Sequence, residues 1–583
     1  MKTSAALSLL SILGGSFVVA APEPQGGHGS GSGSSPKAYI RNGTVFGRHS
    51  PEWSQDFFLG VPYAKPPTGP NRFRPPQYIT QKQDIQAKQT GFWCYGYRGD
   101  QWEYPQSEDC LTLNIVRPSG INYNSRKLPV AVFLHGGGFL IGSAHDQRYN
   151  MTFLVDQSVK EGTPIIGINI NYRLGGLGWL ASRQVAGTKN LNLGLKDQRT
   201  AFHWIQENIR AFGGDPKKVT LFGASAGALC IGLHQLAYNG RDDKLFSQVM
   251  LLSGSPTFFG TPPFPETGQA KYDYILSQTG CSEAMDSLDC LRSVPIATLN
   301  AAINSTSGQF TSPTVDGEFV SGLASENLKW GRFVKVPAVI GGTTDEGAGY
   351  SRRVAKVDTE AELRAVLAGT AAGLLKPNML NTLLDLYDIT VSIPSPSTFS
   401  PAYPNDLGTI NHGLQYHRLS AILGDLTFIL GKRNYAQRLA QHNVPVWSFR
   451  SNVLPNGYAN WSGAVHTTDV NFIFNNLIAP GYDIGGTGVM IIQDPMGGPK
   501  AAQFKELADF VSRSFVRFFA RGDPAAGRRV GDVNWVKYKH GSGVANQITW
   551  DVNGGGVDVQ IEQDNYRQAG VQFLMDYQLQ MSL

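Results

Sequence analysis

A serine stands at the centre of the segment Gly223-Ala-Ser225-Ala-Gly227, which has the pattern G-x-S-x-G. With 67 glycines in 583 residues, chance alone gives about half a match, so the pattern needs structural context. A strand-like run, Val219–Phe222, precedes it and an apolar helical pattern follows. A strand, a tight turn and a helix form a nucleophile elbow, which lifts a serine hydroxyl above the edge of a sheet. A glycine-rich structural turn is the alternative interpretation of this segment alone.

A glycine run, His135-Gly-Gly-Gly138, follows another strand pattern, Pro129–Leu134. Acyl transfer from an ester passes through an intermediate with a negatively charged oxygen, which fixed N–H groups must approach closely. Side chains on the donor residues would block that approach. We therefore expect an oxyanion hole formed by the N–H groups of Gly137, Gly138 and Ala226. A plain turn is again the alternative.

A serine nucleophile needs a histidine base, and the base needs an acid that orients it. In hydrolases with a nucleophile elbow, the acid and then the histidine follow the serine along the chain. Six histidines satisfy this order: His234, His412, His417, His442, His466 and His540. His466 lies in a loop of small residues after a strand pattern, where catalytic groups are common, whereas His234 lies in the helix after the elbow. We predict that His466 is the base, with a surface histidine as the alternative.

The acid has two adjacent candidates. Glu346 and Asp345 both lie in a glycine-rich segment, 341–349, directly after the strand pattern Val336–Ile340. Both have the correct order in the chain and the correct end of a strand. We predict Glu346, and the residues alone leave Asp345 as its rival.

Short apolar runs that alternate with helical patterns must position these residues. The strand-like runs are Pro129–Leu134, Pro164–Ile170, Val219–Phe222, Gln248–Leu252, Val336–Ile340 and Val444–Ser448. Helical patterns cover Leu195–Phe212, Ala226–Tyr238 and the segment from Phe504 to Phe518, which Gly522 ends. This alternation predicts the α/β class, with a large, mostly parallel central sheet flanked by helices. Ligands bind such sheets at the carboxyl ends of the strands.

The N-terminus of the chain indicates that the protein is exported. Lys2 and the apolar stretch from Ala5 predict a signal peptide, 1–20, and a Gly/Ser tract predicts a flexible leader, 21–36. Residues 37–583 are then a single catalytic domain. No later stretch has the roughly 18 apolar residues of a membrane span, so we expect a secreted protein without stable membrane insertion. A net charge of +5 is too dilute to indicate nucleic acid as a partner.

Export makes disulfides and glycosylation plausible. The near pairs Cys94/Cys110 and Cys281/Cys290 would close short loops, which leaves Cys230 as a buried free thiol. Four sequons are candidate glycosylation sites: Asn42, Asn150, Asn304 and Asn460. The sequence shows no His, Cys and Asp cluster with metal-ligand spacing, so we expect neither a metal nor a cofactor.

Several longer motifs follow one another along the chain: Phe58–Pro67 with Arg72-Phe73, Ser107–Asn114, His135–Phe139, Asn171–Leu174, Asn192–Gln198 and Phe212–Pro216. In these motifs, and from about Tyr39 to the C-terminal helix, the chain resembles the type-B carboxylesterase/lipase family, which includes cholinesterases and secreted fungal lipases. The resemblance implies an α/β-hydrolase fold and a Ser225, Glu346, His466 triad, with Glu346 favoured over Asp345. It also supports Gly137, Gly138 and Ala226 as the oxyanion hole, and the disulfides Cys94–Cys110 and Cys281–Cys290.

The chain departs from the family pattern in two features, one residue and one loop. The family usually has a glutamate directly before the nucleophile, and this chain has Ala224. We expect an altered rate or specificity, not inactivity. The loop between Cys94 and Cys110, a longer lid in the family's lipases, encloses only fifteen residues here. We therefore expect an ordinary carboxylesterase with weak or no activation at a lipid surface.

The sequence leaves the substrate and two other functions open. A small-molecule or lipid ester fits the predicted chemistry, and aromatic residues in the segments Ser255–Thr267 and Thr468–Gly488 indicate either an apolar pocket or core. They are Phe258, Phe259, Phe264, Phe472 and Phe474. A non-catalytic binding protein on the same fold and an acyltransferase are the alternatives. The intact triad positions disfavour the first, and nothing in the sequence excludes the second.

Overall fold

A computed structural model describes most of the chain from Ser35 to Met581. The described residues are 35–97, 101, 103–121, 127–257, 264–305, 309–310, 312–351, 353–354, 356–387, 411–459, 462–481, 494–525, 533–539, 545–553 and 556–581. The predicted signal peptide, nearly all of the leader, Phe258, Phe259, Asn460 and His540 lie outside them. Residues Pro36–Leu583 form one compact unit. Within the described ranges, no helix has the length and apolar character to cross a membrane.

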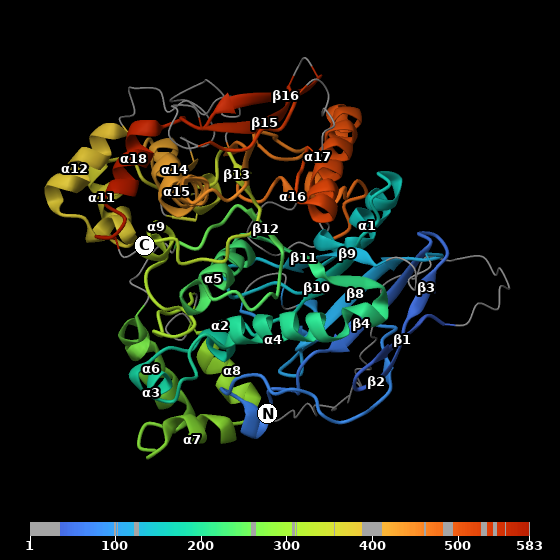
Figure 1. Cartoon of the computed structure of the whole chain (residues 1–583). Helices are drawn as coiled ribbons and strands as arrows, with labels where there is room; N and C mark the ends of the chain where they lie inside the picture. The colour runs from blue at the N-terminus through green and yellow to red at the C-terminus, as the bar shows by residue number, and fades with distance from the viewer. Residues whose placement is uncertain are drawn as a thin grey trace, which may run out of the picture. The chain divides into compact units, whose positions relative to one another are not determined.

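An 11-stranded sheet, with the strand order β16-β15-β14-β13-β12-β11-β9-β10-β8-β4-β3, forms the centre of this unit (Figure 1). The strands are β3 (Arg48–Ser50), β4 (Gln55–Pro62), β8 (Thr112–Pro118), β9 (Leu128–Leu134), β10 (Ile166–Ile170), β11 (Gly214–Ala224), β12 (Gln248–Leu252), β13 (Ala338–Thr343), β14 (Val446–Ser451), β15 (Asn546–Asn553) and β16 (Gly556–Gln563). Neighbours pair in parallel from β10 to β15 and antiparallel at both edges. The predicted α/β-hydrolase fold with a mostly parallel sheet is confirmed, and the six apolar runs correspond to β9–β14.

Helices cover both faces of the sheet. Alternate side chains of β9 point to opposite faces: Val130 and Val132 pack with residues of α4 (Leu193–Asn208) and α5 (Ala226–Gly240). Phe133 instead packs with α1 (Met151–Lys160), α16 (Val470–Phe474) and α17 (Ala501–Arg521). Because β9 is buried on both faces, it reads in the sequence as a continuous apolar run. Phe472 and Phe474, left open as pocket or core, are fully buried in α16 and belong to the core.

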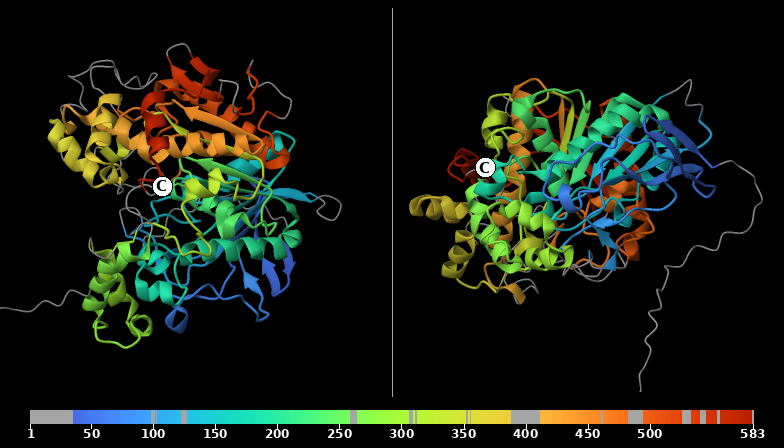
Figure 2. Two further views of the ribbon diagram at one scale, coloured as in Figure 1. Left: turned by 60° about the vertical axis from the view of Figure 1, so that its left-hand side comes forward. Right: turned by 90° about the horizontal axis from the view of Figure 1, so that it is seen from below.

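A separate group of helices has its own apolar cluster. It contains residues of α11 (Glu360–Ala368), α12 (Pro377–Leu386), α14 (Tyr416–Gly424) and α18 (Gln568–Asp576), which lie together in both views of Figure 2. A π-helical segment, Asp425–Ile429, leads from α14 into α15 (Leu430–Gln441). This group carries Phe428 toward the candidate site described below.

The five cysteines form two disulfides and one free thiol. Disulfides join Cys94 to Cys110 and Cys281 to Cys290, which are the expected pairs. Cys230 is free and lies within α5, and burial raises the pKa of its thiol to about 12. The thiol is therefore protonated and unreactive at neutral pH.

A buried ion pair joins two of the family motifs. Arg173, just after β10, donates through Nε and Nη2 to Asp197 of α4, with N–O distances of 2.8 and 2.7 Å. The two side chains are 4% and 0% exposed. The Arg173 backbone N–H also donates to Asp197, at 3.1 Å. The carboxylate thus fixes α4 to the segment that follows β10.

We predict that Asp197→Ala lowers the free energy of unfolding by about 3 kcal/mol or more, because it leaves the Arg173 guanidinium buried without its counter-ion. The matched control is Asp156→Ala, which removes the partly exposed pair with Lys160 in α1. Its effect should stay below about 0.5 kcal/mol. Urea unfolding at pH 7 measures both, and equal effects would contradict a stabilising role for the buried pair.

Candidate active site

Ser225 lies in the turn between β11 and α5. Its backbone has φ +55° and ψ −123°, a conformation that L-residues rarely adopt, and its N–H donates to the Leu252 carbonyl at 2.8 Å. A Cβ at Gly223 would lie 2.7 Å from the Leu134 carbonyl oxygen, and one at Gly227 would lie 2.1 Å from the same atom. Only glycine fits at both positions because the end of β9 packs directly against the turn. This is the geometry of a nucleophile elbow.

The strand register brings the segments that follow β9, β11, β13 and β14 to the same edge of the sheet. Gly223 is paired with Leu134, Leu252 with Gly341, and Thr343 with Ser451, each near the carboxyl end of its strand. The segments that follow these strands therefore start side by side. They contain the glycine run, Ser225, Glu346 and, further along, His466.

The side chains of Ser225, His466 and Glu346 form one row of hydrogen bonds. His466 Nε2 lies 2.8 Å from Ser225 Oγ, and His466 Nδ1 lies 2.5 Å from Glu346 Oε2. Glu346 is fully buried, and its Oε1 accepts the Thr343 N–H at 2.8 Å. With Nδ1 protonated and bonded to the carboxylate, Nε2 is free to take the serine proton. The arrangement can therefore generate a nucleophilic alkoxide.

Two aromatic rings pack on the imidazole of His466. The Phe428 ring lies 4.4 Å from it between centroids, and the Tyr350 ring lies 5.8 Å away. Such packing restricts rotation of the imidazole around the Nδ1 hydrogen bond. Neither residue was predicted from the sequence, because both lie in short helical segments with no distinguishing pattern.

The glycine run lies against the elbow. A Cβ at Gly136 would be 3.0 Å from the Ser225 Cβ, so the backbone passes directly over the serine. Gly137 and Gly138 have φ values of +104° and +60°. Within the described part of the chain, their N–H groups donate to no other protein group. Ala226 is the first residue of α5, where a backbone N–H has no intrahelical acceptor.

His135 supports the run and stays neutral. Its ring stacks on Tyr172 with centroids 4.4 Å apart, and the Tyr172 hydroxyl donates to the His135 carbonyl at 2.7 Å. Burial lowers the pKa of His135 to about 4. The residue therefore contributes packing but no charge next to the proposed oxyanion donors.

The remaining candidate residues make other contacts. Asp345 faces the backbone of Ala464, which donates to its Oδ2 at 2.9 Å. His234 of α5 forms a hydrogen bond of 3.0 Å between its Nε2 and Gln198 Oε1 of α4, and His417 is buried in α14. His442 ends α15 near the Lys329 carbonyl.

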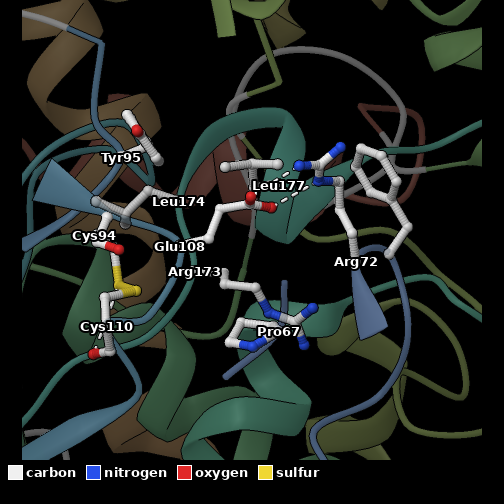
Figure 3. A pocket seen from close by; sticks show the side chains of 11 residues that line it. Pro67, Arg72, Cys94, Tyr95, Glu108, Cys110, Arg173, Leu174 and Leu177 are labelled. Carbon is white, nitrogen blue, oxygen red and sulfur yellow. Dashed lines mark hydrogen bonds and ion pairs between the residues drawn. A yellow bond between two sulfur atoms is a disulfide. The ribbon is translucent and has the colours of Figure 1, made fainter. Parts of the chain in front are cut away.

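A small pocket lies beside the Cys94–Cys110 disulfide, and none of Ser225, Glu346 and His466 lines it. Figure 3 shows Arg72 pointing toward Glu108 across this pocket. The two side chains form an ion pair, with Nε–Oε1 and Nη2–Oε2 distances of 2.6 and 2.8 Å. Arg173, which also lines the pocket, is paired with Asp197. No group of three or more His, Cys, Asp or Glu side chains in the described ranges is arranged to hold a metal ion.

The sequons differ in exposure. The Asn42 side chain is half-buried and donates to the Ile79 carbonyl, and the Asn150 side chain caps α1 by accepting the Thr152 N–H. Asn304 ends α8 (Ile296–Asn304) and is exposed. Glycosylation stays a prediction at all four positions, and exposure favours Asn304.

Asp469 is a buried carboxylate close to this site. It lies three residues after His466 and is 0% exposed, and its carboxyl oxygens accept no hydrogen bond from another described residue. Burial raises its pKa to about 7, and the negative charge of Glu346 adds to the increase. A second negative charge here is therefore unfavourable, and the carboxyl is largely protonated below neutral pH.

We predict that Asp469→Asn removes a pH-dependent loss of stability. The folded-state pKa lies above the unfolded value of about 3.9, so the folded wild type binds the extra proton and loses stability as pH rises toward 7. Between pH 5 and pH 8, the wild type should lose about 2 kcal/mol more unfolding free energy than the variant. Urea unfolding at both pH values measures this. Identical pH profiles would contradict the proposed titration of Asp469.

Comparisons with known proteins identify the family of this chain. The sequence model of the Carboxylesterase family matches residues 34–572. Secreted lipase 1 of Botryotinia fuckeliana is 32% identical over 84% of this chain and 85% of its own, and Lipase 5 of Diutina rugosa is 33% identical over 72% and 80%. The crystal structure of Aspergillus niger EstA superposes with a TM-score of 0.78 at 28% identity, covering 94% of this chain and 99% of its own. The chain therefore belongs to the carboxylesterase family and is a carboxylic ester hydrolase with the α/β-hydrolase fold.

Proposed function

We propose that the enzyme hydrolyses esters through an acyl-enzyme on Ser225. Ser225 Oγ attacks the ester carbonyl while His466 Nε2 takes its proton, and Glu346 stabilises the resulting imidazolium through Nδ1–H. The N–H groups of Gly137, Gly138 and Ala226 bind the oxyanion. His466 then protonates the leaving alcohol.

In the second half of the reaction, His466 removes a proton from water, and the hydroxide attacks the acyl carbon. Collapse of the tetrahedral intermediate breaks the bond to Ser225 Oγ, which takes the proton back from the imidazole. The carboxylic acid is released and the free enzyme is restored. The observation that carries the proposal is the row of hydrogen bonds from Ser225 through His466 to Glu346.

Ala224 supports the expectation of an altered rate or specificity. Its methyl group is fully buried in an apolar cluster that includes Phe222 and Leu252. The residue before the proposed nucleophile therefore supplies no carboxylate beside the elbow. No member of the triad depends on it, so activity is retained.

The loop between Cys94 and Cys110 favours a carboxylesterase over an interfacially activated lipase. The Gln101 side chain is fully buried, donates to the Cys94 carbonyl at 2.8 Å and accepts the Gly142 N–H at 2.8 Å. The Tyr97 N–H also donates to the Leu140 carbonyl at 2.9 Å. A short loop tied to the oxyanion segment is unlike a flap that opens at a lipid surface.

We infer that the enzyme acts outside the cell on small-molecule or lipid esters. The support is the predicted signal peptide and the names of two relatives, Secreted lipase 1 and, from Gibberella zeae, Secreted triacylglycerol lipase LIP1. Transfer of the acyl group to an alcohol instead of water is distinguished by product analysis with competing alcohols.

We predict that a fluorophosphonate probe labels Ser225, because the activated hydroxyl attacks phosphorus as it attacks a carbonyl. Mass spectrometry of the labelled peptide identifies the residue, and Ser225→Ala abolishes both labelling and ester hydrolysis.

Glu346→Gln should lower kcat by about 10²–10⁴, since the carboxylate no longer orients the imidazole or stabilises its charged form.

His466→Ala should lower kcat at least as far, and its matched control is His442→Ala, a half-buried histidine at the end of α15. That control should retain kcat within about twofold. Retention of ester hydrolysis by a folded Ser225→Ala protein would refute the proposed mechanism.

We predict equal specific rates on dissolved and emulsified esters of the same chain length, because Tyr97 and Gln101 tie the loop to the segment after the glycine run. Initial rates on tributyrin below and above its solubility limit test this, with Ser225→Ala as the background. A sharp increase once droplets form would instead indicate interfacial activation.

A further inference from the structure

Asp345 and Glu346 are adjacent, yet they contact different parts of the loop that carries His466. Glu346 contacts the imidazole, whereas Asp345 contacts the backbone two residues earlier. The Asp345 N–H donates to the Ala464 carbonyl at 3.0 Å, and the Ala464 N–H donates to Asp345 Oδ2 at 2.9 Å. One residue therefore binds both polar backbone groups of Ala464. The contact continues as a parallel bridge between Asp345 and Val465.

The backbone of the His466 loop is shaped around this carboxylate. Gly463 has φ +63°, and a Cβ there would lie 2.2 Å from Asp345 Oδ2. Asp345 and Ala464 are 6% and 0% exposed, so water cannot easily replace the hydrogen bond. Loss of the acceptor would leave a buried N–H group in the loop and free the chain before His466.

Neighbouring groups hold the segment of Asp345 in place. The buried guanidinium of Arg450 donates through Nη1 to Thr344 Oγ1 at 2.7 Å and pairs with Glu562 through two bonds of 2.7 and 2.6 Å. Thr344 Oγ1 also donates to Asn452 at 2.7 Å. These bonds fix the segment of Thr344 and Asp345 to β14 and β16. Through its contacts with Ala464, Asp345 in turn holds the loop of His466.

We propose that Asp345 is a positioning residue, whose carboxylate fixes Gly463–Val465 and thereby holds the His466 imidazole between Ser225 and Glu346. The inference rests on the proposed function of that triad. Displacement of a catalytic group by about 1 Å lowers rates by as much as 10²-fold. Since substrate binding does not use this contact, the effect falls on kcat.

The test compares Asp345→Ala with Asp345→Asn, whose amide oxygen can still accept the Ala464 N–H. Asp345→Ala should lower kcat on nitrophenyl butyrate about 20–100-fold with KM within about threefold, and slow fluorophosphonate labelling of Ser225 by the same factor. Asp345→Asn should restore kcat to within about fivefold of wild type. Gly463→Ala, which forces a methyl group against an intact Asp345, should reproduce the loss of kcat.

The matched control is Ser158→Ala. Like Asp345, the Ser158 side chain is a buried acceptor of a backbone N–H, that of Ile165 at 3.1 Å, but its own hydrogen bonds are to Val155 and Ile165. This variant should lower the Tm while kcat stays within about threefold. A folded Asp345→Ala protein with wild-type kcat would overturn the inference, as would equal loss of kcat in Ser158→Ala or Asp345→Asn. If Asp345→Ala does not fold, Asp345→Asn and Gly463→Ala decide the question by the same criteria. Activity surviving in Ser225→Ala would instead overturn the proposed function, whatever Asp345 does.

Discussion

The close approach of the end of β9 to the turn at Ser225 is the constraint on which the site depends. Cβ atoms at Gly223 and Gly227 would lie 2.7 and 2.1 Å from the Leu134 carbonyl oxygen. With no side chains between them, the backbone after β9 passes directly over the proposed nucleophile. The oxyanion donors and the hydroxyl are thereby placed by the sheet itself. Side-chain packing then has to position only the histidine and its acid.

Buried carboxyl groups next to the site perform that second task. Glu346 and Asp345 each contact the His466 loop, one at the imidazole and one at the backbone. Asp469 lies close by, and its raised pKa reflects burial together with the charge of Glu346. One ionised carboxylate is therefore held where the imidazolium forms, and a second is disfavoured. The site therefore has a backbone fixed by the sheet and one ionised carboxylate next to the imidazole.

The sequence predicted the parts of this structure that have local patterns. The six apolar runs became β9–β14, because strands buried on both faces need continuous apolar residues. The elbow was predictable because only glycine tolerates the close backbone contacts. The antiparallel edge strands β3 and β16 had no such pattern, since they are only partly buried. Phe428, Tyr350 and the role of Asp345 were also missed, because they depend on contacts between distant segments. The family resemblance, rather than residue spacing, separated Glu346 from Asp345.

The Gln101 side chain restricts how the disulfide loop of this enzyme can be changed. It joins the Cys94 carbonyl to the Gly142 N–H, so the disulfide loop is tied at Gln101 to the segment after the glycine run. A longer insertion in the loop that displaced Gln101 would also release Gly142. Grafting a mobile flap from a true lipase onto this scaffold therefore requires that the anchor be kept and that the added residues enter on the solvent side of it. Through Gln101, the length of the disulfide loop is coupled to the position of the Gly142 backbone.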